Sequence, residues 1–305
     1  AFKKLYSKKI YMKVTGFSFI KNAIIYQYPV KEALESILPL CDEIIVAVGD
    51  SSDATRELVG SIDPQKIKII DSVWDEKLRE GGRVLAAETD KAFREIAGDS
   101  DWCIYIQGDE VLHEKYHAAI RHAMEQYKEN KAVDGFLFNY KHFYGSFDFV
   151  GISSKWYRNE IRIIRNNKKI YSYRDAQGFR KNENEKLVVV PLDAFIYHYG
   201  WVREPGAMQA KNTNFGNYWN GGNEIVKNIK GPEEPFNYML VDALKKFTGT
   251  HPKVMQERIQ NKNWQFNYDP SFNHLKLKDQ FKNILEQLTG QRFFDYKNYK
   301  IYRGK

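Results

Sequence analysis

Short apolar runs alternate with amphipathic stretches along the first 140 residues. Each run is rich in apolar and β-branched residues and has the length of a buried strand. The runs lie at residues 14–20, 43–48, 66–71 and 102–106. Between them, residues 29–38 and 83–97 carry apolar side chains at helical spacing, and Pro29 stands at a first-turn position. This alternation predicts an α/β fold with βαβ crossovers and a mostly parallel, Rossmann-like sheet flanked by helices.

The pattern changes beyond residue 140, where short strands carry aromatic and basic residues. After a helix at 113–129 and a strand at 135–140, further strands are expected at 160–165, 170–173, 187–190 and 195–199. Helical spacing returns at 208–219, 238–247, 253–260 and 276–288. We therefore predict a parallel half over residues 14–140, an α+β continuation of the same domain over 141–205, and a helical C-terminal extension over 206–305.

Composition and charge narrow the class of protein. The chain has 305 residues, is 43% hydrophobic and carries a formal charge of +8, so it is globular with a substantial core. Residues 201–305 hold 17 Lys and Arg against 10 Asp and Glu. That local excess favours a phosphate-rich acceptor or peripheral contact with a membrane surface. No nucleic-acid reading motif is present, so we expect no nucleic-acid partner.

Cysteine usage and hydropathy bear on the compartment. Cys41 and Cys103 both stand in apolar contexts, which favours reduced core residues over a disulfide framework. No run of about 18 apolar residues and no signal-peptide pattern occurs. We expect a cytoplasmic protein, with peripheral membrane attachment left open.

Acidic and small residues follow two of the predicted strands. Asp50, Ser52 and Asp53 follow the second strand, and the sequence Gln-Gly-Asp-Glu at 107–110 follows the fourth. The carboxyl ends of parallel strands form the ligand-binding edge of an open sheet. Carboxylates there suit Mg²⁺ or Mn²⁺, which can bridge to nucleotide phosphates. The alternative is that these residues only cap helices in solvated loops.

Taken together, residues 14–140 resemble the nucleotide-sugar glycosyltransferases of the GT-A fold, in particular family 2. In that family an Asp-Gly-Ser-x-Asp loop follows the second strand and an Asp-x-Asp metal motif follows the fourth. The resemblance implies a nucleotide-sugar site formed by Asp50, Ser52, Asp53, Arg83, Gln107, Asp109, Trp201 and Arg203. It implies a divalent metal, Mn²⁺ or Mg²⁺, held by Asp109, Glu110 and His198. Gln107 stands where the family has its first Asp, so the charge on the metal would rest on the other residues.

A transferase of this kind needs a base for the acceptor hydroxyl. Asp175 is our first candidate and Glu160 the second, because both lie after the metal motif; surface ion pairing with a nearby Arg is the alternative for each. The resemblance implies transfer of a sugar from a nucleoside diphosphate to a hydroxyl of a glycan or lipid-linked acceptor, in surface polysaccharide assembly.

Two other functions stay open. A nucleotidyltransferase would need a Gly-rich basic loop after the first strand, which residues 17–26 lack. A non-catalytic sugar- or nucleotide-binding module of the same fold is favoured by Gln107. The chain lacks the motifs of P-loop enzymes, dinucleotide dehydrogenases, zinc proteases and α/β-hydrolases.

Overall fold

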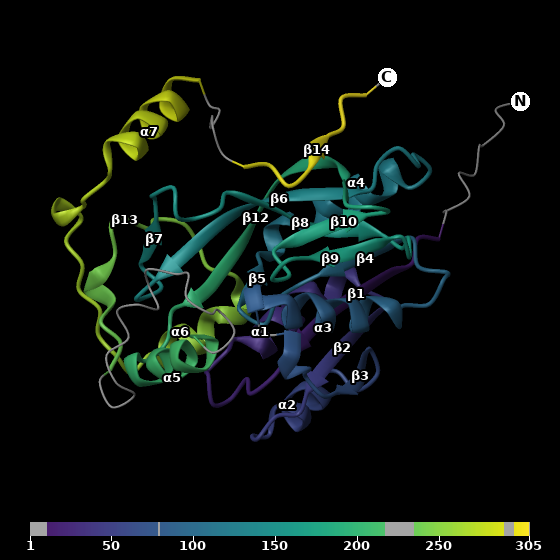
Figure 1. Cartoon of the computed structure of the whole chain (residues 1–305), viewed down its shortest axis with the longest axis horizontal. Coiled ribbons are helices and arrows are strands. Elements are labelled where there is room, and N and C mark those ends of the chain that lie inside the picture. Colours follow the sequence, from purple (N-terminus) through teal and green to yellow (C-terminus); the bar gives the residue numbers. More distant parts are fainter. Residues whose placement is uncertain (1–10, 79, 217–234, 290–295, 305) are drawn as a thin grey trace, which may run out of the picture.

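A parallel four-stranded unit begins the central sheet of the computed structural model, which describes residues 11–78, 80–216, 235–289 and 296–304. Its strands lie side by side in the order β3 (Ile67–Ser72), β2 (Glu43–Gly49), β1 (Val14–Ile20) and β4 (Trp102–Tyr105), all parallel (Figure 1). The crossovers carry α1 (Val30–Ile37), α2 (Thr55–Ile62) and α3 (Arg83–Arg94). The predicted α/β class is therefore confirmed.

The sheet continues beyond β4 with mainly antiparallel pairs. β8 (Asn159–Arg165) lies between β4 and β6 (Gly135–Tyr144) and is antiparallel to both. β12 (Val188–Trp201) runs parallel to β6 and antiparallel to β5 (Glu110–Leu112). The two strands expected at 187–190 and 195–199 are thus one long strand with an irregularity between Pro191 and Phe195.

A small second sheet and a fourth helix complete the central part. β9 (Ile170–Tyr173), β10 (Gly178–Lys181) and β11 (Glu185–Lys186) form a separate antiparallel sheet. The helix expected at 113–129 is α4 (His117–Tyr127), preceded by a 3₁₀ turn.

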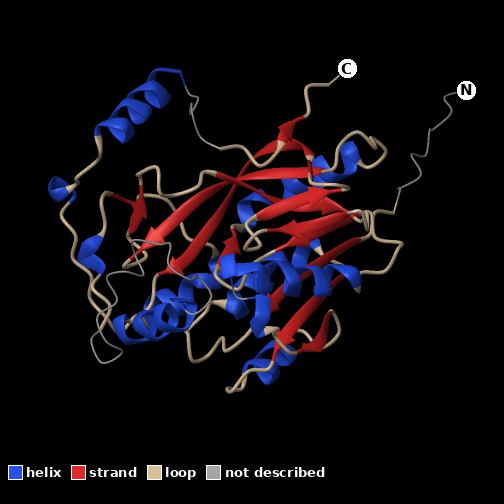
Figure 2. Cartoon of the chain, in the orientation of Figure 1, coloured by secondary structure: helices blue, strands red, loops and turns tan. Residues whose placement is uncertain are grey.

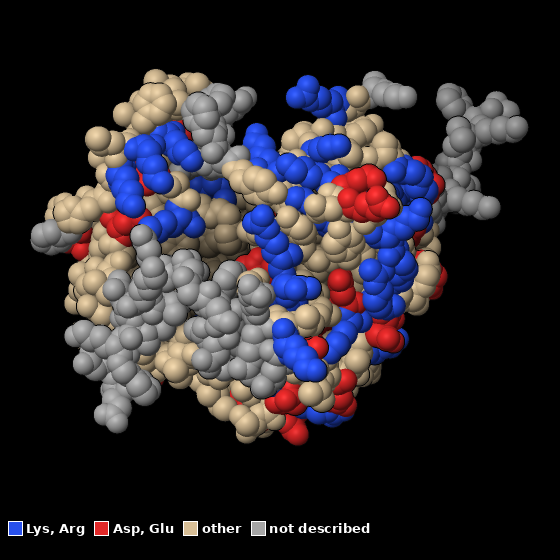
Figure 3. Space-filling view, viewed as in Figure 1, with Lys and Arg blue, Asp and Glu red and all other residues tan. Residues whose placement is uncertain are grey.

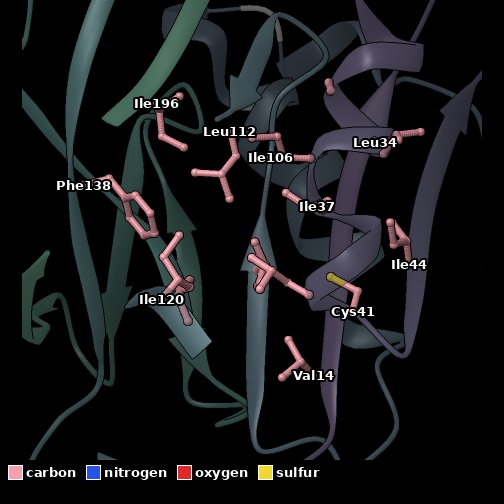
Figure 4. Close-up of a cluster of buried hydrophobic side chains, with 14 of the residues drawn as sticks. Val14, Leu34, Ile37, Cys41, Ile44, Ile106, Leu112, Ile120, Phe138 and Ile196 are labelled. Carbon is pink, nitrogen blue, oxygen red and sulfur yellow. The ribbon is translucent and has the colours of Figure 1, made fainter. Parts of the chain in front are cut away.

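The alternation of side chains along the parallel strands divides the core between two faces. Side chains such as Val14, Ile44 and Ile104 pack with α1, α2 and α4 in one buried cluster (Figure 4). Side chains on the opposite face of the same strands, such as Phe17 and Ile45, pack instead with α3 and the β9–β10 hairpin. Helices and the small hairpin therefore cover both faces, which is why these strands read as continuous apolar runs (Figure 2).

The C-terminal third is less helical than expected. It contains α5 (Pro205–Gly216), α6 (Gln256–Gln260) and α7 (Leu277–Thr289), but the helix predicted at 238–247 is wrong. Those residues form a 3₁₀ turn and β13 (Leu244–Lys246), which pairs with β7 (Phe149–Gly151). β14 (Lys300–Ile301) pairs with β12, so the chain returns to the main sheet. The end of the helix predicted at 208–219 lies outside the described residues.

One prediction concerns the close approach of β6 and β8. A methyl group at Gly135 would lie 2.2 Å from the carbonyl oxygen of Ile163, a backbone atom that cannot move aside. We expect Gly135→Ala to lower the free energy of unfolding by about 3 kcal/mol, as overpacking does. Urea unfolding followed by circular dichroism measures the change. Gly98→Ala is the matched control because no atom lies within 4 Å of the added methyl; equal losses in both variants would contradict the expectation.

Candidate functional site

Three strand ends meet at one edge of the sheet. Ile20 pairs with Val48, and Phe17 pairs with Tyr105, so β1, β2 and β4 finish side by side. The structure therefore brings the loop containing Asp50 next to the loop after β1 and places both near the turn at 107–110.

The acidic loop after β2 is held by its own hydrogen bonds. Asp53 accepts the backbone N–H groups of Ile24 and Ile25 at 3.0 and 2.9 Å and also caps Thr55. The backbone N–H of Ser52 donates to Asn22 at 2.8 Å. Asp53 and Ser52 thus join the loops after β1 and β2.

Asp50 stays at the surface of this loop. Its side chain is 47% exposed and lies 2.6 Å from the ammonium of Lys21. Among the three predicted residues of the loop, Asp50 is therefore the carboxylate placed to meet a ligand.

Glu110 is the most fully paired carboxylate of the turn. Arg162 donates to both of its oxygens, from Nη2 at 2.7 Å and from Nε at 2.8 Å. The Tyr140 hydroxyl and the Gln107 backbone N–H add hydrogen bonds at 2.7 and 3.2 Å. Both side chains of the ion pair are at most 1% exposed. Because its oxygens are taken by these donors, Glu110 is not placed to bind a metal, which corrects that part of the expected ligand set.

Asp109 points the other way, into a cluster of basic residues. Its Oδ2 lies 3.7 Å from Nε2 of His198 and 3.8 Å from the ammonium of Lys211. Burial raises the pKa of Asp109, but electrostatic interaction with the nearby basic side chains of His198, Lys211 and Arg203 outweighs burial and holds the pKa below its usual value. The carboxyl group is therefore ionised at neutral pH.

The hydrogen bonds of two histidines fix which nitrogen of His198 is protonated. His142 Nε2 lies 2.8 Å from the carbonyl oxygen of Tyr157, so this nitrogen carries the proton. Burial holds the pKa of His142 well below its usual value, so its ring is neutral and its Nδ1 accepts. His198 Nδ1, 3.2 Å away, must then donate. Burial holds the pKa of His198 below its usual value, although Asp109 and Glu110 oppose this shift. In the neutral ring with its proton on Nδ1, the lone pair of Nε2 faces the Asp109 carboxylate.

This pair of acceptors fits a divalent cation. A carboxylate oxygen and an imidazole lone pair 3.7 Å apart have no proton between them, and a cation bound to both would satisfy each. Sites for Mg²⁺ or Mn²⁺ commonly use few protein ligands and complete their shell with phosphates and water. Within the described residues no group of three or more His, Cys, Asp or Glu side chains is placed to hold a metal. The fit is thus to Asp109 and His198 alone.

Arg203 and Trp201 border the same cluster at the end of β12. Arg203 is buried, lies over the Tyr28 ring at 4.7 Å and donates to the carbonyl oxygens of Gly200 and Tyr26. Trp201 is partly exposed and lies 5.7 Å from the Lys211 ammonium. Arg83, in contrast, is exposed on the first turn of α3.

The two predicted catalytic acids, Glu160 and Asp175, interact electrostatically. Burial first, and then the charges of Glu110 and Asp175, raise the pKa of Glu160 to about 8, although Arg162 opposes the rise. Burial also raises the pKa of Asp175. Asp175 lies at the tip of the β9–β10 hairpin between Arg174 and Ala176, which both have positive φ. Strained backbone of this kind is common in functional sites.

Gln107 connects this hairpin to the turn after β4. Its side-chain amide donates to the Ala176 carbonyl and to the Tyr105 hydroxyl, each at 3.1 Å. The residue that departs from the family pattern therefore anchors the hairpin carrying Asp175.

Sequence reasoning missed three contributors to the site. Arg162 stands among the three isoleucines of β8, and a charged residue between apolar neighbours is a signal for a buried ion pair. His142 stands at an alternating position of β6, and Lys211 lies in a polar stretch of α5. Neither of these two carries a sequence signal, because their relevance comes from contacts across the fold.

Comparison with known proteins gives matches only among solved structures. No family model matches the chain, and no curated protein matches. Staphylococcus aureus TarS 1–349 in complex with UDP-GlcNAc is 13% identical, with a TM-score of 0.40 over 68% of this chain and 66% of that chain.

Glucosyl-3-phosphoglycerate synthase from Mycobacterium tuberculosis, with Mn²⁺, UDP and phosphoglyceric acid, is 14% identical, with a TM-score of 0.28 over 44% of this chain and 43% of that chain. 4-Diphosphocytidyl-2C-methyl-D-erythritol synthase from Anaerococcus prevotii is 11% identical, with a TM-score of 0.30 over 51% of this chain and 70% of that chain. The chain spans 65% of TarS 1–349 and 39% of the longer TarS structure. At these TM-scores the matches carry no argument about activity, which rests on the site itself.

A second prediction concerns the buried ion pair. We expect Arg162→Met to lower the free energy of unfolding by about 3–5 kcal/mol, because it leaves the Glu110 carboxylate buried without its cation. Urea unfolding measures the loss. Arg56→Met removes a comparable but exposed pair with Asp71, for which we expect little or no change because water screens exposed ion pairs. Similar effects in the two variants would show that the buried ion pair contributes no more to the free energy of unfolding than the exposed one.

Proposed function

We propose that the chain is a GT-A-type glycosyltransferase that moves a sugar from a nucleoside diphosphate donor to a hydroxyl of an acceptor. The observation that carries this proposal is the facing pair of acceptors, Asp109 Oδ2 and His198 Nε2, at the carboxyl edge of the parallel strands. Lys211 and Arg203 lie beside the pair. A site of this composition suits a diphosphate with a divalent cation.

Asp109 and His198 would hold Mn²⁺ or Mg²⁺, which would supply positive charge to the leaving diphosphate. Lys211 adds a basic group, whose side-chain nitrogen donates to the Gly200 carbonyl at 2.8 Å and lies 3.8 Å from Asp109. Burial, with the charge of Arg203, lowers the pKa of Lys211 to about 7, although Asp109 opposes the shift. The exposed Asp50 and the backbone of Ser52 lie at the neighbouring strand end, where the nucleoside would bind. Trp201 offers an aromatic face, and Arg203 fixes the end of β12 to the loop after β1.

Glu160 is the proposed base, with Asp175 beside it. The acceptor oxygen forms a bond to the anomeric carbon of the donor sugar, and the bond from that carbon to the diphosphate breaks. The electron pair leaves with the nucleoside diphosphate, and the acceptor proton passes to the Glu160 carboxylate. A base whose pKa lies near the working pH suits this step.

The site gives less support to a nucleotidyltransferase or to a non-catalytic binding module. The loop after β1 contains a single basic residue, Lys21, and no glycine, whereas a nucleotidyltransferase would be expected to bind triphosphate there. A binding module has no need of two neighbouring acids with raised pKa values, which are typical of catalytic sites.

Surface polysaccharide assembly, a glycan or lipid-linked acceptor, and a cytoplasmic location remain predictions. No helix in the described part of the chain is long and apolar enough to cross a membrane. Peripheral membrane contact through the basic C-terminal region also remains a prediction. There, α7 exposes four large apolar side chains: Leu277, Phe281, Ile284 and Leu288.

The third prediction tests the donor site. We expect at least one of UDP, CDP, GDP or ADP to bind in calorimetric titration with Mn²⁺ and to bind more weakly with EDTA. Asp109→Asn should weaken the metal-dependent binding by about 30-fold or more, because losing one charged partner of a buried contact costs about 2 kcal/mol or more. His198→Gln should act in the same direction.

Asp99→Asn is the control, since this Asp is 69% exposed on the loop preceding β4, at the opposite edge of the sheet. Undiminished metal-dependent binding in Asp109→Asn would contradict the site, and the absence of binding by every nucleotide would contradict the function.

The fourth prediction concerns the base. Hydrolysis of the donor with water as acceptor should rise with pH up to about 8 and then level off, because Glu160 acts only when ionised. Glu160→Gln should slow the reaction by about 10²-fold or more and remove this pH dependence. The groups that set the pKa are Arg162, Glu110 and Asp175.

The pH dependence of stability provides an independent measurement of the pKa of Glu160. The pKa of Glu160 is raised from 4.5 in the unfolded chain to about 8 when folded. The folded chain therefore loses stability as pH rises from 4.5 to about 8, by roughly 1.4 kcal/mol for each pKa unit. Glu160→Gln lacks this loss, so its melting temperature should exceed that of the parent increasingly over this range. A constant difference between pH 5 and pH 8 would contradict the burial of an ionisable Glu160.

A further inference from the structure

Glu160, the proposed base, is one of the residues that line a cavity of about 410 Å³. Its walls come from the segment before β8, from Gln177 of the β9–β10 hairpin, from Lys282 of α7, and from residues 296–299 near the C-terminus. Figure 3 shows the molecule hollowed between the part that carries α7 and the main sheet, with Lys and Arg atoms around the hollow. The size is that of an ordinary small-molecule site.

Basic side chains outnumber acidic ones in the lining of this cavity, although one of the basic residues, Lys155, also pairs with Asp242 at 3.5 Å. Four basic residues line it, and Glu160 is the single acid in its lining. The basic residues are Lys155, Arg158, Lys282 and Lys297. Aromatic side chains, including Trp156 and Tyr296, also line the cavity. Rings of this kind pack against the apolar faces of sugars, while the cations suit a negatively charged group.

Asn298 supplies a separate sign that a ligand belongs here. It lines the cavity and is 5% exposed, yet neither atom of its side-chain amide has a hydrogen-bond partner among the residues that the structure describes. Unpaired buried amide groups are costly and are normally satisfied by a partner. A methyl group placed at Gly178 would lie 2.5 Å from the Asn298 amide nitrogen and 3.2 Å from a Glu160 oxygen. The amide and the proposed base therefore border the same small space.

Tyr157 joins this cavity to the donor side. It lines the cavity, and its ring lies 6.3 Å from the His198 ring. The pKa of Tyr157 is raised well above its usual value, by burial first and then by the charges of Glu110, Glu160 and Asp109, although Arg162 opposes the rise. Tyr157 thus stands between the Asp109–His198 pair and Glu160, where donor sugar and acceptor would meet.

We propose that this cavity is the acceptor site and that it takes a phosphate-bearing sugar or polyol. The inference rests on the proposed glycosyltransferase function and adds the chemical class of the acceptor. A phosphate monoester carries a charge of about −1.5 to −2 at neutral pH, which matches the excess of Lys and Arg. Asn298 hydrogen-bonds the acceptor, the aromatic rings pack against it, and its reactive hydroxyl lies at Glu160.

The test measures binding directly. Glycerol 3-phosphate and glucose 6-phosphate are titrated against the full chain by calorimetry, with glycerol and glucose as neutral counterparts. A saturating nucleoside diphosphate with Mn²⁺ is present throughout, so that the phosphates cannot bind at the donor site. We expect the phosphates to bind at least tenfold more tightly than their neutral counterparts. A polyprenyl phosphate in detergent micelles, compared with micelles alone, distinguishes a lipid-linked source of the same chemistry from a soluble one.

Two variants assign the binding to the cavity. Lys155→Gln combined with Lys297→Gln should weaken phosphate binding by about tenfold or more, whereas Lys31→Gln combined with Lys68→Gln, outside the cavity lining, should not change it. Asn298→Leu should also weaken binding without lowering the melting temperature, because the amide has no partner in the described protein to lose.

Equal affinity for phosphates and neutral counterparts, or unchanged affinity in the cavity variants, would overturn the inference. If a nucleoside diphosphate binds and phosphates do not, the acceptor class alone is wrong. If no nucleoside diphosphate binds, the proposed function fails, and with it the acceptor role.

Discussion

The buried ion pair between Glu110 and Arg162 determines how the turn after β4 is arranged. Two adjacent carboxylates leave the strand, and bidentate pairing to Arg162 draws one of them into the protein. The Tyr140 hydroxyl completes the pairing from β6. Because Arg162 holds the Glu110 side chain, the preceding residue, Asp109, points toward β12, where its carboxylate faces His198. Without Arg162, the Glu110 carboxylate would be a buried charge with no partner. The ion pair therefore strongly favours this arrangement of the turn.

β12 carries the other half of this arrangement. His198 pairs with Glu110 in the antiparallel ladder and with His142 in the parallel one, so its ring is placed by both neighbours. The chain then continues through Trp201 and Arg203 into α5, which supplies Lys211. β12, the connection after it and α5 therefore deliver the imidazole, the aromatic ring and the basic side chains of Arg203 and Lys211 to the surroundings of the Asp109 carboxylate.

Asp109 and Glu160 are both carboxylic acids, but their pKa values shift in opposite directions because their surroundings differ. Asp109 is surrounded by cations and stays ionised, which suits a metal or a diphosphate. Glu160 is buried close to Glu110 and Asp175, and its pKa of about 8 suits a group that takes up a proton during transfer. Divergent pKa values within one site are a common basis for separate roles. The proposed donor and acceptor sides follow this division, with Tyr157 between them.

The α/β class, the positions of β1 to β4 and the acidic residues at their ends could be predicted from local signals, because apolar runs and turn residues are visible in the sequence. It also pointed to Asp109, His198, Glu160 and Asp175. It could not separate Asp109 from Glu110, since the choice depends on Arg162, which lies 52 residues further along the chain. The β13 strand inside a predicted helix and the cavity closed by Asn298 likewise arose only in the tertiary structure. Both depend on contacts between segments far apart in the chain, and such contacts leave no periodic pattern in either segment.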